Sequence, residues 1–265
     1  MSTTEAEREE ARAQARAQWN ANPCGAVPTD AYDRAFFERV EAERYRDQYW
    51  QRGTFDYSSF AGGRVLEIGV GLGTDLKQFA RNGAQCFGVD ITDTHLELTR
   101  RNFELEGRPI ELRKADATRL PFPDGSFDCV YSFGVIHHIP DVDTVLAEVF
   151  RVLKPGGVFQ VGVYHLFSIH TALLLLTALK KGQLASLGVA GVLSTIERGA
   201  DGREIKPYVK LYSRGMLRRA LSRAGLRTTR VAVRHVRFDD LPVLNVFRRL
   251  ERLLGWYVCA FAERR

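Results

Sequence analysis

Short runs of β-branched and aromatic residues alternate with helical segments through the middle of the chain. The apolar runs fall at residues 64–69, 85–90, 110–116, 127–134 and 157–165. Segments with helical periodicity separate the first four runs, as at 94–107, and another at 142–157 precedes the fifth. This order is typical of right-handed βαβ units. The pattern therefore predicts an α/β fold with a parallel sheet that helices cover on both faces.

The N-terminal part of the chain has helical periodicity and no strand pattern. Residues 4–18 are rich in Glu, Ala, Arg and Gln, which predicts an exposed helix that ends before Pro23 and Gly25. Residues 30–51 predict a second helix, whose apolar stripe consists of Phe36, Phe37, Val40, Tyr45 and Tyr49. We therefore expect residues 1–59 to form a helical cap.

A strongly apolar helical segment, residues 166–200, interrupts the alternation after the fifth strand. Beyond it the pattern predicts a helix at 214–224 and strands at 228–236 and 255–262. We therefore expect residues 60–165 and 212–265 to form the core, and residues 166–211 to form an insert between these two pieces.

Length and composition fit one large α/β domain with appendages. With 265 residues and 45% hydrophobic content, the chain can fill a substantial core. The four cysteines, Cys24, Cys86, Cys129 and Cys259, form no C-x-x-C pair, which argues against a zinc site and a disulfide framework. The N-terminus has no apolar signal-peptide core. The longest apolar run, 171–179, is shorter than the about 20 residues that span a bilayer. We therefore expect a cytoplasmic protein, at most peripheral to a membrane, without a bound metal.

Charge is unevenly distributed along the chain. Residues 201–265 contain 16 Lys and Arg against 6 Asp and Glu, a net charge of +10, whereas residues 1–200 have a net charge of −4. Such a basic region attracts an anionic substrate, a membrane surface or RNA, or it is a solvated face of a helix and a strand.

A glycine-rich loop follows the first predicted strand. The segment VLEIGVGLGTD reads E-x-G-x-G-x-G from Glu67, with glycines at 69, 71 and 73. Glycine permits a tight turn and lets the backbone approach a ligand closely. A dinucleotide fingerprint would place Gly or Ala at position 74, where this chain has Thr74. The loop therefore predicts a ligand other than a dinucleotide.

Polar residues also close the next predicted strands. Asp90 ends the second strand, where a carboxylate can accept both hydroxyls of a ribose. Asp116 ends the third strand, where it can accept the exocyclic amine of an adenine, with the small Ala117 beside the ring. The fourth strand ends in SFGV at 132–135. Carboxyl ends of neighbouring parallel strands meet at one edge of the sheet, which is where open α/β sheets bind ligands.

Four motifs in order, VLEIGVGLGTD, FGVDIT, KADATRLPFPDGSFDCVYSFGVIHH and RVLKPGG, resemble class I S-adenosylmethionine-dependent methyltransferases of the small-molecule type. Quinone, sterol and natural-product enzymes belong to this type. The resemblance covers roughly residues 60–165. It implies a Rossmann-like fold with a mostly parallel seven-stranded sheet, to which the helical cap and the insert are added.

The resemblance also implies S-adenosyl-L-methionine as the cofactor. Glu67 and the glycine loop would hold its methionine moiety, Asp90 its ribose, and Asp116 with Ala117 its adenine. The cofactor-binding residues that the resemblance implies are Glu67, Gly69, Gly71, Gly73, Asp90, Ile91, Asp116, Ala117 and Phe133.

Methyl transfer from a sulfonium is an in-line displacement, so alignment of the acceptor supplies much of the catalysis, roughly 7–11 kcal/mol. A base is needed only if the acceptor must lose a proton. The candidates near the reacting end are His137, His138, Tyr164 and His165. Consecutive residues of a helical turn point about 100° apart, so only one of the two adjacent histidines can face the ligand. His137 and His138, and likewise Tyr164 and His165, also fit a purely structural role.

The flanking regions are expected to select the acceptor. Tyr45, Tyr49 and Trp50 form either part of the core or an aromatic lid over the cofactor. The leucines of the insert roof an apolar acceptor pocket, form a subunit interface in a homodimer, or dip into a membrane surface through residues 166–193. We expect a small, hydrophobic acceptor, such as a lipid-like, isoprenoid or aromatic compound.

Two other functions compete with this interpretation. The basic C-terminal region favours an RNA methyltransferase. The fourth strand, however, ends in YSFGV. It lacks the Asp/Asn-Pro-Pro-Tyr/Phe tetrapeptide that amino-methyltransferases of similar fold carry at this position, so no nucleic-acid partner is expected. A non-catalytic S-adenosylmethionine-binding protein is the other alternative. The intact Asp90, Asp116 and three glycines argue against it.

Overall fold

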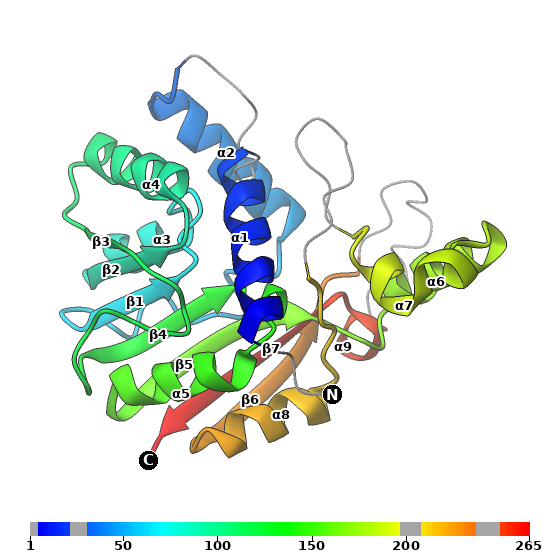
Figure 1. The fold of residues 1–265 in the computed structure, drawn as a ribbon. Helices are drawn as coiled ribbons and strands as arrows, with labels where there is room; N and C mark the ends of the chain where they lie inside the picture. The colour runs from blue at the N-terminus through cyan, green and yellow to red at the C-terminus, as the bar shows by residue number, and fades with distance from the viewer. Residues whose placement is uncertain (1–4, 22–30, 197–207, 237–249) are drawn as a thin grey trace.

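One seven-stranded sheet organises the molecule, in the order β3-β2-β1-β4-β5-β7-β6 (Figure 1). The computed structural model describes residues 5–21, 31–196, 208–236 and 250–265. The strands are β1 (Arg64–Ile68), β2 (Gln85–Asp90), β3 (Glu111–Lys114), β4 (Phe127–Phe133), β5 (Leu153–Tyr164), β6 (Leu226–Arg234) and β7 (Tyr257–Arg264). All neighbours pair in parallel except β7, which is antiparallel to both β5 and β6. The predicted mostly parallel, seven-stranded sheet is confirmed.

Helices cover both faces of the sheet. In chain order they are α1 (Glu5–Ala21), α2 (Arg34–Asp47), α3 (Leu76–Arg81), α4 (Asp93–Leu105), the 3-10 turn η1 (Ile136–His138), α5 (Val142–Val152), α6 (Ile169–Lys180), α7 (Gln183–Leu193), α8 (Arg214–Arg223) and α9 (Glu251–Leu254). Leu66 and Val130 of the central strands pack with α5 and α8. Val65 and Tyr131, which point the other way, pack with α3 and α4. The alternation of side chains along each strand thus fills two hydrophobic layers.

Local hydrogen bonds move two boundaries away from their predicted positions. Helix α2 begins at Arg34 and not at residue 30, because the Asp33 carboxylate caps it by accepting the Phe36 N–H at 2.8 Å. Strand β3 ends at Lys114, so the predicted strand to residue 116 is too long. Asp116 lies in the following turn, where its carboxylate accepts the Thr118 N–H at 2.8 Å.

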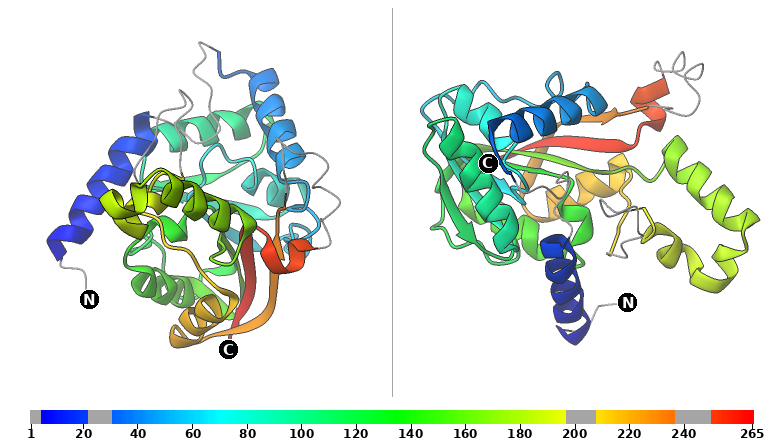
Figure 2. Two further views of the ribbon diagram at one scale, coloured as in Figure 1. Left: turned by 90° about the vertical axis from the view of Figure 1, so that its right-hand side faces the viewer. Right: turned by 90° about the horizontal axis from the view of Figure 1, so that it is seen from above.

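The insert after β5 contains α6 and α7, which form a helical hairpin at one end of the molecule (Figures 1 and 2). The turn between them is at Gly182, whose φ of 69° favours glycine. No helix among the residues described is long and apolar enough to cross a membrane.

Arginines of the basic C-terminal region make contacts within the protein. The guanidinium of Arg230 lies 3.8 Å from the centre of the Phe261 ring. Arg227 forms an ion pair with Glu263 on the neighbouring strand. Part of the positive charge of this region therefore supports the packing of β6 against β7.

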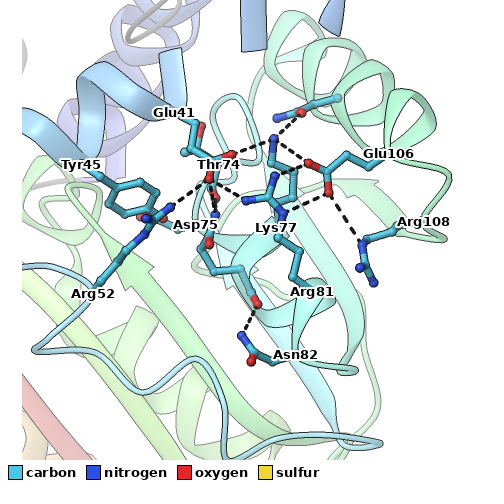
Figure 3. Close-up of polar contacts among 12 residues, drawn as sticks. Glu41, Tyr45, Arg52, Thr74, Asp75, Lys77, Arg81, Asn82, Glu106 and Arg108 are labelled. Carbon is cyan, nitrogen blue, oxygen red and sulfur yellow. Dashed lines mark hydrogen bonds and ion pairs between the residues drawn. The ribbon is translucent and has the colours of Figure 1, made fainter. Parts of the chain in front are cut away.

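A buried ion-pair network attaches α2 to the core (Figure 3). Lys77 of α3 is 1% exposed, and its Nζ lies 3.0 Å from a Glu41 oxygen of α2 and 3.2 Å from a Glu106 oxygen at the end of α4. Arg81 pairs with the same two carboxylates. Burial tends to raise the pKa of Glu41 and of Glu106, but the bonds from Arg81 and Lys77 lower both pKa values below the usual range. The network thus joins three helices through the buried Lys77 and two largely buried carboxylates, with the exposed Arg81 at its edge.

Removal of Lys77 tests this network. We expect Lys77→Met to lower the free energy of unfolding by roughly 3 kcal/mol, because it leaves buried carboxylates without one of their partners. Urea denaturation measures the change. Because the two carboxylates have lowered pKa values in the folded state, the loss should shrink as the pH falls below about 4. The control is Arg46→Met, which removes the exposed pair of Arg46 with Asp47. Equal stability of the two variants would contradict the role of the network.

Candidate functional site

A cavity of about 450 Å³ opens at the carboxyl ends of β1, β2 and β4. Glu67, Asp90 and Phe133 line it from the sheet, and Trp19 of α1 and Arg44 of α2 line it from the cap. The motif residues that are separate in the sequence therefore meet in one place. Of the nine predicted cofactor-binding residues, eight line this cavity, and Gly73 does not.

The glycine loop has backbone angles that favour glycine, with φ of 77°, 54° and 74° at Gly69, Gly71 and Gly73. A Cβ atom added at Gly71 would meet no atom within 4 Å, so the backbone there borders open space in the cavity. A Cβ atom at Gly73 would lie 2.9 Å from a methyl carbon of Thr99. Gly71 therefore exposes backbone to a ligand, whereas Gly73 lets the loop pack closely against α4.

Glu67 brings an unpaired acceptor to the cavity. Its side chain is buried, and its Oε2 atom has no hydrogen-bond partner in the protein. Burial raises the pKa of Glu67 well above its usual range, the negative charge of Asp75 adds to this effect, and Arg44 opposes it. A buried acceptor without a partner is costly, so this oxygen is suited to a donor that a ligand supplies.

Asp90 is held rigidly at the end of β2. Its Oδ1 accepts the Thr92 N–H at 3.0 Å and the Thr92 hydroxyl at 2.9 Å, and lies 3.3 Å from Nδ1 of His95. Its Oδ2 accepts the Gly71 N–H at 3.3 Å. Burial tends to raise the pKa of Asp90, but the hydrogen bonds from His95 and Thr92 lower it. The carboxylate is therefore ionised and oriented before any ligand binds.

Three further residues continue this wall beyond Asp90. Ile91, Asp116 and Ala117 all line the cavity. They come from the segments that follow β2 and β3, so the turn that ends β3 early still delivers its carboxylate to the site. The wall combines an apolar surface with one carboxylate, which is suited to a flat ring with an exocyclic donor.

Arg44 faces the cavity from the cap and is fixed by Asp75, the residue that follows the glycine loop and Thr74. Its Nε and Nη2 donate to the two oxygens of Asp75 at 3.1 and 2.5 Å. Its guanidinium lies 5.2 Å from the centre of the Phe133 ring. The negative charge of Asp75 raises the pKa of Arg44 well above its usual range against the effect of burial. The sequence motifs gave no sign of this cation, because its helix lies outside them.

The other end of the cavity has aromatic walls. Trp19, Phe133, Tyr164 and Tyr257 line it together with His138. The rings come from α1, β4, β5 and β7, and the Trp19 ring lies 5.7 Å from the His138 ring. Residues 208–212 lie behind this end, since the Tyr212 N–H donates to the Tyr164 carbonyl at 2.9 Å. This end is suited to an apolar or aromatic ligand with few polar groups.

The two adjacent histidines have different surroundings. His138 lines the cavity, and its Nδ1 lies 2.9 Å from the Tyr208 carbonyl oxygen. Because a carbonyl only accepts, Nδ1 carries the proton in the neutral ring and Nε2 is the basic nitrogen. His137 is fully buried behind the cavity wall, where neither ring nitrogen has a hydrogen-bond partner. The centre of its ring lies 4.0 Å from that of the Tyr164 ring, and the two rings are tilted by 37°. Burial, and to a lesser extent His138, lowers the pKa of His137 well below its usual range.

The second pair of candidates is divided in the same way. Tyr164 lines the cavity. His165 points away from it, is buried, and has its Nδ1 3.0 Å from the Gly255 carbonyl oxygen. Burial lowers the pKa of His165 despite this hydrogen bond. The structure therefore brings His138 and Tyr164 to the cavity and places His137 and His165 in supporting positions.

The three aromatic residues for which a lid was one alternative, and the described leucines of the insert for which a roof was one alternative, do not line the cavity. Tyr45 donates to Asp75 at 2.9 Å, Tyr49 donates to Glu251 at 2.8 Å, and Trp50 donates to His235 at 3.1 Å. No described residue of the insert lines the cavity either. The aromatic residue that the cap does contribute is Trp19, from the helix that looked fully exposed. Among the described residues, no group of three His, Cys, Asp or Glu side chains is placed to hold a metal ion.

Comparisons with known proteins match this architecture. Residues 66–161 match a family model described as a methyltransferase domain. The chain is 41% identical over 106 residues to a sterol 24-C-methyltransferase of Aspergillus fumigatus, which covers 39% of this chain and 28% of that protein. It is 32% identical over 169 residues to a ubiquinone biosynthesis O-methyltransferase of Chelativorans sp., which covers 64% of this chain and 60% of that protein. The chain thus spans less than two thirds of the length of either curated relative.

A solved structure shares the fold over a longer stretch. An SAM-dependent methyltransferase of Methanosarcina mazei superimposes with a TM-score of 0.60 and 19% identity, which covers 78% of this chain and 94% of that chain. The common fold therefore extends well beyond the segment that carries the sequence motifs.

Proposed function

We propose that this protein transfers the methyl group of S-adenosyl-L-methionine to a small, hydrophobic organic acceptor. The match of residues 66–161 to a methyltransferase domain supports this proposal. One observation carries the proposal: the same cavity joins the strand-end carboxylates to an aromatic end that contains His138. The bound cofactor would supply an electrophilic sulfonium methyl group. The protein has to position that group and the acceptor, and to exclude water.

The residues of the strand-end part of the cavity fit this cofactor. The open backbone at Gly71 and the unpaired Oε2 of Glu67 provide a cradle and an acceptor for the methionine ammonium. Arg44 provides a cation for the methionine carboxylate. Asp90 provides an ionised acceptor for the ribose hydroxyls, and Asp116 provides a carboxyl oxygen as acceptor for the adenine amine. The ammonium, the carboxylate, the ribose hydroxyls and the adenine amine of the cofactor thus each have a complementary group in the cavity.

The aromatic end of the cavity supports an apolar acceptor. Rings of Trp19, Tyr164 and Tyr257 offer a flat hydrophobic surface that favours isoprenoid or aromatic compounds. The relatives whose names mention sterol and ubiquinone biosynthesis support the same class. His138 would take the proton of an acceptor hydroxyl at its Nε2, while the Tyr208 carbonyl holds the ring in the required tautomer.

Replacement of Asp90 tests the cofactor site. We expect Asp90→Ala to weaken S-adenosyl-L-methionine binding about tenfold or more, because a charge-assisted hydrogen bond is worth ~1.5–3 kcal/mol. Isothermal titration calorimetry measures the affinity. The matched control is Asp93→Ala, which removes an exposed carboxylate three residues away that pairs with Lys114. Unchanged affinity in Asp90→Ala, or tight binding of a nicotinamide dinucleotide by the wild type, would contradict the assignment.

Cofactor binding should also release a proton from Glu67. Burial raises the pKa of Glu67 in the ligand-free protein, whereas an ammonium at Oε2 favours the ionised form. Affinity should therefore rise as the pH increases through the raised pKa, and fall as the pH decreases through it. Calorimetry in buffers of different ionisation enthalpy counts the proton. Glu67→Gln should abolish this release and Glu43→Gln, at the same cavity, should keep it; an unchanged proton count in Glu67→Gln would exclude this role.

His138 should affect turnover and not cofactor binding. We expect His138→Gln, which can still donate to the Tyr208 carbonyl, to slow the methylation of hydroxylated aromatic or isoprenoid acceptors by about 10²-fold or more. S-adenosylhomocysteine release over a range of pH is the measurement. Equal rates and pH profiles, or a preference for polar cationic acceptors, would argue against this role.

A further inference from the structure

The hairpin of α6 and α7 exposes large hydrophobic side chains to solvent. Six of them lie within 23 residues and are between 45% and 63% exposed: Phe167, Leu173, Leu176, Leu179, Leu187 and Val189. A surface helix in water normally carries polar residues on its outer face. In α6 the outer face instead has leucines at three-residue spacing. Contact of this face with water is therefore unfavourable, and a binding partner that covers it would stabilise it.

Charge in this hairpin is confined to its tip. Residues 166–196 contain no Asp or Glu, and their charged residues are Lys180 and Lys181, whereas 26% of the whole chain is charged. Both lysines are exposed and flank the turn at Gly182 between the two helices. The hairpin therefore combines an apolar surface with a purely positive tip.

The position of the hairpin separates it from the cavity. Its helices extend away from the sheet at the end opposite α3 and α4 (Figures 1 and 2). No described residue of the hairpin lines the cavity, so its apolar surface is not explained by the acceptor site. α6 has 12 residues, and α7 has 11 with a break at Gly188, so neither helix is long enough to span a bilayer. A contiguous apolar surface that stays exposed marks a site of interaction with a protein or a membrane, and a hairpin too short to span a bilayer can bury such a surface at the boundary between head groups and acyl chains.

We propose that the hairpin of α6 and α7 docks on the surface of an anionic lipid bilayer. The exposed leucines enter the boundary between head groups and acyl chains. Lys180 and Lys181 contact lipid phosphates, which attract cations and would repel an acidic tip. The charge of the tip favours this partner over a second copy of the chain, because two such tips would repel each other. Docking does not depend on the methyl-transfer activity proposed above.

Vesicle sedimentation of the full chain tests the proposal. We expect binding to vesicles of phosphatidylcholine mixed with phosphatidylglycerol and much weaker binding to phosphatidylcholine alone. Binding should weaken at about 1 M salt, where the Debye length is about 3 Å. Inorganic phosphate at moderate concentration should not abolish it, which distinguishes a bilayer from the free anion. Absence of binding to the anionic vesicles would overturn the proposal.

Paired variants locate the contact. Lys180→Glu with Lys181→Glu, and Leu176→Glu with Leu179→Glu, should each weaken vesicle binding about tenfold or more. Arg100→Glu with Arg101→Glu reverses two adjacent, exposed charges on α4 and should leave binding unchanged. All three double variants change exposed side chains, so S-adenosyl-L-methionine affinity should stay at the wild-type value and report correct folding. Full vesicle binding by the hairpin variants would overturn the proposal. So would a lipid-free dimer that the leucine variant dissociates, if no vesicle binding is seen.

Discussion

The shape of the cavity depends on the hydrogen bonds that the buried carboxylate of Asp75 accepts. It accepts hydrogen bonds from Arg44, Tyr45 and Gln51 of the cap and from Tyr131 of β4, all between 2.5 and 3.1 Å. A buried charge is tolerated only when its hydrogen-bonding capacity is filled in this way. Because Asp75 directly follows the glycine loop, the same bonds fix the loop, the central strand and the cap relative to one another.

This arrangement also sets the charges of the site. Asp75 holds Arg44 at the cavity and, together with burial, disfavours ionisation of Glu67. Among the described residues that line the cavity, Arg44 thus presents a fixed cation beside Glu67, whose carboxyl group keeps its proton more readily than usual. A zwitterionic ligand part, with one ammonium and one carboxylate, complements both groups at once. The cap is therefore part of the binding site and not only a cover, and the network around Lys77 supports it from the side away from the cavity.

The sequence predicts the sheet and the strand-end residues well, because both follow from local patterns. Short β-branched runs that alternate with helical segments define β1 to β5, and Glu67, Asp90 and Phe133 lie at or next to strand ends whose position the topology dictates. Arg44 and Trp19 were missed, because each reaches the cavity through the way a helix packs on the core, and a single sequence carries no signal for that. The end of β3 was placed too late because the turn is fixed by the Asp116 side chain itself.

The histidine pair shows why residue type alone does not assign a chemical role. His137 and His138 are neighbours with ring centres 4.1 Å apart, yet the ring of His137 is fully buried without a hydrogen bond and the ring of His138 borders the cavity beside a carbonyl oxygen. Burial makes protonation of His137 unfavourable, so it stays an uncharged ring that packs between His138 and Tyr164. Only a ring with a defined tautomer and access to the ligand can accept a proton during a reaction. The 3-10 turn at residues 136–138 therefore directs one of two consecutive histidines into the core and the other to the cavity.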